Sequence, residues 1–374
     1  MKTKIACLLA SSILLGAIAV GQDQPTPKAS KAAAFPSCTD SLPTVAVPDG
    51  PHGLFAIFFP GAVRINARAN QYLLHNPVVC GANFYLVWNE IDRGPSTNPR
   101  YDFSHVEHEM EPWVKAGKQV NLIVWATHYG GGQRATPDYV FRKVQSVRCE
   151  NAGEVPVFWE KDFIENYQQF MAAVVQHFGN NSAVGYIRFG LGQGGETYPA
   201  CMYALKNKGF SPDRWRKYIF DMLDYEASLH SPKQLMVGIN SFGNPPNLEF
   251  ADAVARRAVQ LKIATGSQGL QIEDMHADQN GAPCAVDWCH IWREASGKVP
   301  LELQTVKKSD PDGDGRVGSM VELLPFALKL HTQIFEIYMP DWFVAYDPES
   351  PDYPRHHQEY QQAYEAAAKV VGGH

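Results

Sequence analysis

Residues 163–196 have the sequence FIENYQQFMAAVVQHFGNNSAVGYIRFGLGQGGE, in which one hydrophobic periodicity gives way to another. The first part repeats apolar side chains at the three- and four-residue spacing of a helix with one buried face: Phe163, Ile164, Tyr167, Phe170, Met171, Val174, Val175 and Phe178. Residues 184–191 then form a short apolar run, which is typical of a buried strand. The stretch therefore predicts a helix at about 160–178 followed by a strand at 184–191.

The same alternation of strand-like and helix-like segments runs from about residue 52 to the end of the chain. Strands are predicted at 54–59, 83–88, 120–126, 184–191, 234–239, 270–273, 300–304 and 333–339. Helices are predicted at about 104–116, 160–178, 212–229, 250–262, 319–330 and 357–371. Such alternation is typical of βαβ units with a parallel sheet, and eight strands in about 320 residues fit one TIM (β/α)8 barrel.

Composition limits the classes of function that fit a chain of 374 residues. The formal net charge of −6 argues against a nucleic-acid partner, because proteins that neutralise phosphates are strongly basic. Aromatic residues make up 11% of the chain and include 8 tryptophans. Such side chains build cores, and they also stack on the flat faces of ligands such as sugars.

The N-terminal residues have the pattern of a signal peptide. Lys2 and Lys4 precede an apolar run at 5–20, and the small residues Ala17, Ala19 and Gly21 offer a cleavage site. We therefore expect a signal peptide at 1–21, a flexible leader rich in Pro, Ser and Ala at 22–50, and a catalytic barrel at 51–374. The protein is expected to be secreted or periplasmic, with no membrane association after the signal is removed.

Six cysteines lie beyond the predicted signal peptide: Cys38, Cys80, Cys149, Cys201, Cys284 and Cys289. An even number in an exported chain favours disulfides. Cys284 and Cys289 are close enough in sequence to close one loop, and the other four allow three pairings. A set of reduced, buried cysteines is the alternative.

In a TIM barrel the reactive groups lie at the C-terminal ends of the strands. Glu302 alternates with Leu301 and Leu303, so its side chain is expected to point into the mouth of the barrel. Glu196 follows a Gly-rich segment that allows close approach of the backbone to a ligand. Two carboxylates across a cleft suit glycoside hydrolysis, in which one donates a proton and the other attacks the sugar or activates water. Glu196 and Glu302 are therefore the predicted catalytic residues.

Other polar and aromatic side chains at strand ends are predicted to bind substrate. They are Trp88, Trp125, His128, Gln193, Tyr198, Glu273, Gln304, Glu336, Tyr338 and Trp342. Glu273 and Glu336 compete with Glu302 for the role of second carboxylate. Glu336 has an alternative role as the ion-pair partner of Arg188 inside the barrel.

These residues resemble the (β/α)8 glycoside hydrolases of clan A, which carry an acid/base Glu after strand four and a nucleophile Glu near the end of strand seven. Glu196 and Glu302 take those two places, and Trp342 matches a frequent tryptophan under the reacting sugar. The short motifs at 101–104 and 136–140 also resemble clan A. The likeness covers about 52–371 and does not identify a single family.

The resemblance implies a secreted glycoside hydrolase that acts on a poly- or oligosaccharide without an organic cofactor. It implies a retaining reaction with Glu196 as proton donor and Glu302 as nucleophile. Clan A usually has Asn immediately before the acid/base Glu, whereas this chain has Gly195. The segment 190–199 is instead similar to the strand-four motif of β-amylases, whose Glu is the general acid of an inverting enzyme.

Three alternatives remain open on the sequence. One is an inverting, β-amylase-like hydrolase. Another is a secreted carbohydrate-binding barrel without turnover, which the departure at Gly195 favours. The third is a metal-dependent hydrolase, for which the sequence offers only the scattered His128 and His276 at strand ends.

Residues 310–317 have the sequence DPDGDGRV, which resembles the start of an EF-hand calcium loop. Asp310, Asp312 and Asp314 are the predicted ligands of a structural Ca²⁺. The twelfth loop position holds Val321, and Glu322 comes one residue late. A plain turn is the alternative, because Asp and Gly favour turns.

Overall fold

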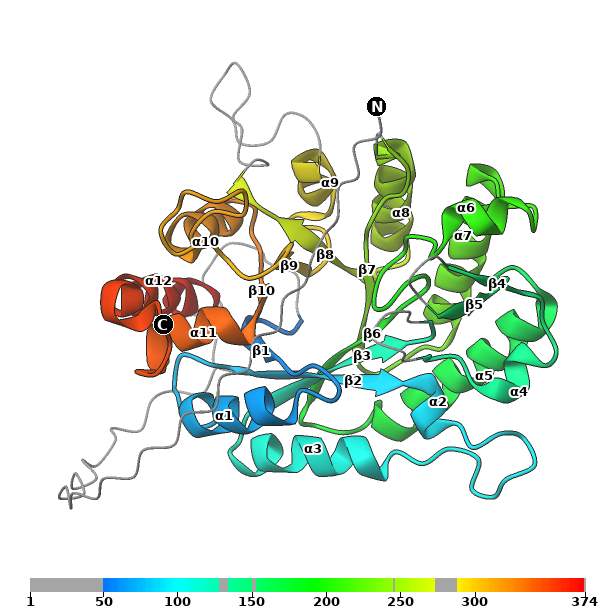
Figure 1. Ribbon diagram of the computed structural model, residues 1–374, viewed down its shortest axis with the longest axis horizontal. Coiled ribbons are helices and arrows are strands. Elements are labelled where there is room, and N and C mark those ends of the chain that lie inside the picture. The colour runs from blue at the N-terminus through cyan, green and yellow to red at the C-terminus, as the bar shows by residue number, and fades with distance from the viewer. Residues whose placement is uncertain (1–49, 128–133, 150–152, 245, 273–287, 373–374) are drawn as a thin grey trace, which may run out of the picture. The chain divides into compact units, whose positions relative to one another are not determined.

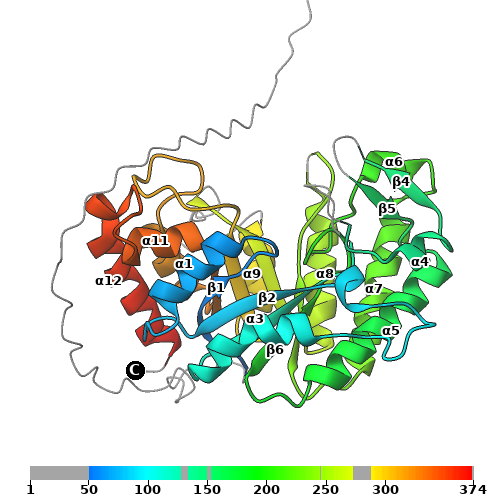
Figure 2. The ribbon, with the colours of Figure 1, turned by 60° about the horizontal axis from the view of Figure 1, so that its bottom comes forward.

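The computed structural model describes residues 50–127, 134–149, 153–244, 246–272 and 288–372. In this part of the chain eight parallel strands close into one barrel, with helices on its outside (Figures 1 and 2). The strands in order around the barrel are β1 (Gly53–Ile57), β10 (Ile334–Ile337), β9 (Leu301–Thr305), β8 (Ala264–Leu270), β7 (Gln234–Gly238), β6 (Val184–Phe189), β3 (Gln119–Trp125) and β2 (Gly81–Val87). The predicted TIM barrel is confirmed.

The helices fall into two groups by length. The longer ones are α1 (Val63–Leu73), α3 (Ser104–Lys115), α5 (Lys161–Phe178), α7 (Pro212–Ser228), α8 (Leu248–Gln260), α9 (Trp288–Ala295), α10 (Met320–Lys329), α11 (Met339–Tyr346) and α12 (Tyr353–Val371). The short ones are α2 (Trp88–Ile91), α4 (Asp138–Phe141) and α6 (Met202–Lys206). Two further strands, β4 (Ser146–Arg148) and β5 (Glu154–Pro156), form a separate antiparallel pair.

Seven predicted strands match the observed ones closely, but the sixth is misplaced. The sequence predicts it at 270–273, whereas β8 covers Ala264–Leu270, has the sequence ATGSQGL and shares only Leu270 with the prediction. This strand consists mostly of small and polar residues, so it lacks the apolar run by which the other strands are recognised. The small residues are there for a steric reason: Gly266 pairs with Glu302 of β9, and a Cβ at position 266 would overlap the Glu302 carboxylate.

The interior of the barrel is layered along its strands. A lower apolar layer contains Phe55, Tyr186, Met236, Ala264 and Ile334. A second set, at the C-terminal ends of the strands, contains Ile57, Tyr85, Val87, Ile123 and Trp125. Buried polar side chains lie between these positions along the same strands: Asn83, Asn121, Arg188 and Glu336. From the C-terminal ends of the strands inward, the barrel therefore contains its mouth, then a layer of buried polar and charged side chains, and then an apolar layer.

The structure answers part of the question of how the cysteines pair. A disulfide joins Cys149, after β4, to Cys201, before α6, with a Cα–Cα distance of 5.4 Å. Cys289 is also disulfide-bonded. Cys284, its predicted partner, and the predicted signal peptide and leader lie outside the described residues. Within the described ranges, no helix combines the length and the apolar character that crossing a bilayer requires.

Replacing Cys201 with serine is expected to lower the free energy of unfolding by up to about 4 kcal/mol, since the bond closes a loop of 52 residues. Urea unfolding of Cys201→Ser and of the double variant Cys149→Ser/Cys201→Ser measures this loss. The two variants should be equally destabilised. A Cys201→Ser variant as stable as the wild type would show that the bond does not form.

Candidate active site at the mouth of the barrel

A pocket of about 160 Å³ lies at the C-terminal ends of the strands. Its lining is aromatic and amide-rich, with a single carboxylate: Phe59, Tyr85, Trp125, Gln193, Gly194, Gly195, Glu196, Tyr198, Gln268, Gln304 and Tyr338. Flat rings provide apolar faces, and amides provide both hydrogen-bond donors and acceptors. Such a lining suits a ligand that has apolar faces and many hydroxyl groups.

The aromatic residues form one continuous wall. Phe59 stacks on Tyr85 with ring centroids 5.5 Å apart and on Tyr338 at 5.9 Å. Tyr85 in turn contacts Trp125 at 4.5 Å. These four rings come from the ends of β1, β2, β3 and β10, so barrel closure itself brings them together.

Glycines place Glu196 at this pocket. The segment after β6 folds back on itself, with the Gly192 N–H donating to the Glu196 carbonyl at 2.7 Å and the Gln193 N–H to the Tyr198 carbonyl at 3.0 Å. A Cβ on Gly190 or Gly192 would overlap backbone atoms of this turn. Glu196 then forms a parallel bridge with Gly238 of β7. The Gly-rich sequence is thus a requirement of the turn that carries the carboxylate.

The environment of Glu196 favours its neutral form. The residue is 7% exposed, and its Oε2 accepts a hydrogen bond from Asn240 Nδ2 at 2.9 Å. Burial raises the pKa of Glu196 to about 7, although the Asn240 hydrogen bond and the charge of Arg188 act in the opposite direction. A carboxyl group with this pKa holds a proton for a large fraction of the time near neutral pH, as a general acid must.

A buried ion cluster lies below the pocket. Arg188 Nη1 donates to Glu302 Oε2 at 3.3 Å and to Glu336 Oε1 at 3.0 Å, and the Tyr186 hydroxyl also donates to Glu336 Oε1. The side chains of Arg188, Glu302 and Glu336 are all inaccessible to solvent. The alternative role of Glu336, as a partner of Arg188, is therefore confirmed, and neither Glu336 nor Glu302 lines the pocket.

Two carboxylates share one guanidinium in this cluster, so negative charge is in excess. Burial and Glu336 raise the pKa of Glu302 well above its ordinary value, while Arg188 and the Ser267 N–H oppose them. The negative charge of Glu196 also raises the pKa of Glu302, so the two predicted catalytic groups interact electrostatically. Glu302 itself does not line the pocket, whereas Gln304, two residues further along β9, does.

Arg188 also explains the glycine before Glu196. A Cβ on Gly195 would lie 2.9 Å from Ile123 Cγ2 and 3.3 Å from Arg188 Nε. The space that an Asn side chain would need is therefore filled by the barrel interior. The departure from the clan A pattern follows from packing around Arg188.

The structure brings together six of the predicted site residues at the pocket: Trp125, Gln193, Glu196, Tyr198, Gln304 and Tyr338. His128 and Glu273 lie outside the described residues. Sequence analysis missed Phe59, Tyr85, Gln268 and Asn240. The inward alternation of Tyr85 with Val87 on β2 was a usable signal for one of them.

The predicted stacking of Trp88 and Trp342 on a substrate is wrong. Both are fully buried. Trp88 stacks on Phe170 of α5 at 5.8 Å, and its Nε1 donates to Asp92. Trp342 packs on Tyr364 of α12 at 4.6 Å. Each belongs to a helix that begins at or just after the strand end, α2 or α11, and these helices direct the indoles into the layer between barrel and helices.

The predicted calcium loop has other hydrogen-bond partners. Asp310 accepts from the Val317 N–H at 3.0 Å, and Asp312 accepts from Arg355 and bonds to His356. Glu322 forms a capping box with Ser319 at the start of α10. Among the described residues, no three His, Cys, Asp or Glu side chains are grouped so that they could hold a metal ion.

Comparisons with known proteins support the fold. No protein-family model and no curated protein sequence matches this chain. Among solved structures, it resembles the catalytic domain of a β-amylase from Paenibacillus polymyxa, with a TM-score of 0.57 and 11% identity over 86% of this chain and 100% of that one. It also resembles an exo-β-1,4-mannosidase from Opitutaceae bacterium strain TAV5, with a TM-score of 0.50 and 11% identity over 89% of this chain and 63% of that one. These structural neighbours are glycoside hydrolase barrels, and identities this low show a shared fold.

Glu196→Gln is expected to stabilise the protein at alkaline pH. The folded-state pKa of Glu196 is raised from 4.5 to about 7, so its favourable contribution is complete below pH 4.5 and is lost as pH rises through 7. Above pH 7 the ionised Glu196 lowers the free energy of unfolding by about 3 kcal/mol, and a neutral glutamine avoids this loss.

Urea unfolding at pH 8 and at pH 4 measures the difference between Glu196→Gln and wild type. The variant should be more stable than wild type at pH 8 and equally stable at pH 4. The exposed Glu349→Gln serves as the control and should change little at either pH. A Glu196→Gln variant that gains no stability at pH 8 would contradict the raised pKa.

Proposed function

We propose that this chain hydrolyses glycosidic bonds in a poly- or oligosaccharide, with Glu196 as the proton donor. One observation carries the proposal: a carboxyl group with a pKa of about 7 lies in a pocket of aromatic rings and amides at the mouth of a (β/α)8 barrel. The rings suit the apolar faces of a sugar, and the amides suit its hydroxyl groups. Asn240 holds the carboxyl group in place through Oε2.

Glu302 is the proposed second carboxylate. Its Oε1 has no hydrogen-bond partner among the described residues, and Arg188 supplies the positive charge that favours its ionised form. Burial and Glu336 raise the pKa of Glu302, so only its ionised fraction can act as the base. Catalysis would then use one carboxyl group in the pocket and one below it.

The depth of Glu302 bears on the stereochemistry. The retention expected from the sequence requires the carboxylate to touch the anomeric carbon. Glu302 has no exposed surface, and Gln304 lines the pocket above it. A carboxylate below the pocket acts more readily on a water molecule than on the sugar, and this supports inversion as the outcome.

The binding-only alternative loses its main support. It was favoured by Gly195, which stands where clan A has Asn, and the packing of Ile123 and Arg188 accounts for that glycine. The raised pKa of Glu196 at the pocket also supports a catalytic role over binding alone.

Export and the absence of an organic cofactor are part of the same proposal. The Cys149–Cys201 disulfide supports an oxidising compartment, as does the signal-peptide pattern at residues 1–21. Acid–base hydrolysis by two carboxyl groups requires only water as co-substrate.

Wild type is expected to release reducing sugar from at least one polysaccharide in a panel of plant and microbial glycans. Glu196→Gln should reduce that rate by about 10²-fold or more, since the amide cannot donate the proton to the leaving oxygen. Glu349→Gln should keep the wild-type rate. Tight binding without release by wild type would establish the binding-only reading, and release that survives Glu196→Gln would show that another group is the acid.

The anomeric configuration of the first product tests the role of Glu302. Proton NMR during early hydrolysis should show the configuration opposite to that of the substrate bond, because water attacks from the far face. Glu302→Gln should abolish turnover, and added azide should not give a glycosyl azide of retained configuration. A product with retained configuration would mean that Glu302 reaches the sugar as a nucleophile.

A further inference from the structure

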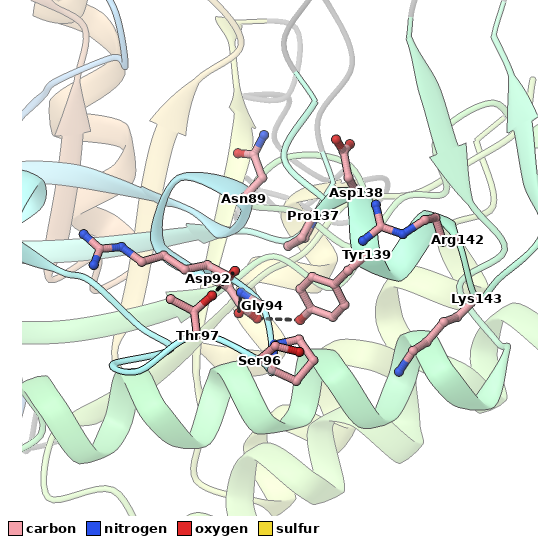
Figure 3. Close-up of a pocket in the computed structure, with 12 residues that line it drawn as sticks. Asn89, Asp92, Gly94, Ser96, Thr97, Pro137, Asp138, Tyr139, Arg142 and Lys143 are labelled. Atoms are coloured by element: carbon pink, nitrogen blue, oxygen red, sulfur yellow. Dashed lines mark hydrogen bonds between the residues drawn. The ribbon is translucent and has the colours of Figure 1, made fainter.

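A larger pocket, of about 710 Å³, shares no lining residue with the candidate active site and has no part in the proposed chemistry. It is formed by the loop after α2, residues 92–97, and by the segment 137–143 that contains α4 (Figure 3). Its remaining lining residue is Asn89, whose backbone N–H donates to the carbonyl of Ala135 at 2.7 Å. The hydrogen bond from the Tyr139 hydroxyl to Asp92 joins the two segments.

The floor of this pocket is a rigid and electrically balanced network. Asp92 is 4% exposed and accepts from Arg100 at 3.0 Å through both carboxylate oxygens. It also accepts from the Tyr139 hydroxyl at 2.5 Å, the Trp88 Nε1 at 3.1 Å and the Gly94 N–H at 2.9 Å. These donors lower the pKa of Asp92, so its carboxylate is ionised, and both of its oxygens already accept hydrogen bonds. The floor therefore presents no spare charge to a ligand.

The wall of the pocket does present spare charge. Arg93 forms an ion pair with Asp102, and Asp138 forms one with Arg134, so these charges are already matched.

Arg142 and Lys143 differ from them, because the backbone N–H groups of both are bonded within the α4 segment but neither side chain forms an ion pair or hydrogen bond with any described residue. Both are exposed, and Figure 3 shows them across the pocket from Thr97. An incoming ligand thus meets two unpaired cations facing a hydroxyl-bearing loop.

The two pockets are built on the same pair of strands. Tyr85 of β2 lines the candidate active site, and Asn89, four residues further on, lines the larger pocket. Four residues span at most about 14 Å of chain. On the neighbouring strand, β3, Trp125 lines the first pocket and the chain continues to the second at Pro137. Both pockets therefore lie toward the C-terminal ends of β2 and β3.

We propose that the pocket lined by Arg142 and Lys143 binds an anionic sugar unit, carrying a carboxylate or a sulfate ester, of the same polysaccharide whose bond is cleaved at Glu196. The guanidinium of Arg142 matches a planar carboxylate or a sulfate with paired hydrogen bonds, and Lys143 adds a second positive charge. Ser96, Thr97 and Asn89 offer partners for sugar hydroxyl groups. That the anion belongs to a sugar rests on the proposed function, whereas the preference for an anion rests on this pocket alone.

Calorimetry on the full chain carrying Glu196→Gln tests the proposal without turnover. The probes are matched oligosaccharides in which each backbone is supplied in neutral, uronate and sulfated forms. At least one acidic form should bind on the order of tenfold more tightly than its neutral counterpart, and added salt should reduce the difference. The uronate and sulfate forms show which anion the pocket takes.

A second variant, Arg142→Ala/Lys143→Ala, locates the effect and should remove the preference for acidic forms. Arg216→Ala/Lys217→Ala is the matched control, since it deletes an adjacent Arg–Lys pair on α7 whose members are already paired with Glu249 and Asp221. It should leave the preference intact.

Equal binding of acidic and neutral forms would overturn the proposal, as would a preference that survives Arg142→Ala/Lys143→Ala. Either result, together with hydrolysis of a neutral polysaccharide by wild type, would leave the proposed function standing without this subsite. A preference that depends on Arg142 and Lys143, in a wild type that cleaves no glycan, would keep the anion site and refute the proposed hydrolysis.

Discussion

The buried guanidinium of Arg188 is the constraint on which the interior of the barrel depends. It is fully enclosed and bonds to both Glu302 and Glu336. Its removal would leave two carboxylates in the core without a counter-charge, a change that typically costs about 3–5 kcal/mol. The neighbours are fitted to this cluster: Gly266 gives room to the Glu302 carboxylate, and Gly195 gives room to the arginine side chain. Residues that look anomalous in the sequence are thus consequences of one buried charge.

The charged layer and the aromatic wall above it define the properties of Glu196. The rings of Phe59, Tyr85, Trp125 and Tyr338 enclose the mouth of the barrel, and the buried cluster closes it from below. A carboxyl group between them has little contact with water, so its charged form is disfavoured and its pKa rises. Stability is thereby sacrificed at neutral pH for a group that can donate a proton, which is a common property of active sites.

The barrel was predictable from the sequence because most of its strands are apolar runs bounded by glycine, proline or polar residues. Glu196 was predictable because the turn that carries it needs several glycines. Strand β8 was not, since its small residues serve the packing of Glu302 from a neighbouring strand. The positions of Trp88 and Trp342 were also out of reach, because whether a helix begins at the strand end or a few residues later decides if a side chain faces the pocket or the core.

The titration of the Glu196 carboxyl group tests the central claim most directly. Infrared difference spectroscopy of wild type against Glu196→Gln isolates the C=O stretch of this single carboxylic acid as pH is varied. The structure predicts that the signal of the protonated acid is lost with a midpoint near pH 7. A midpoint near the ordinary value of 4.5 would show that Glu196 is ionised at neutral pH and would contradict its role as the proton donor.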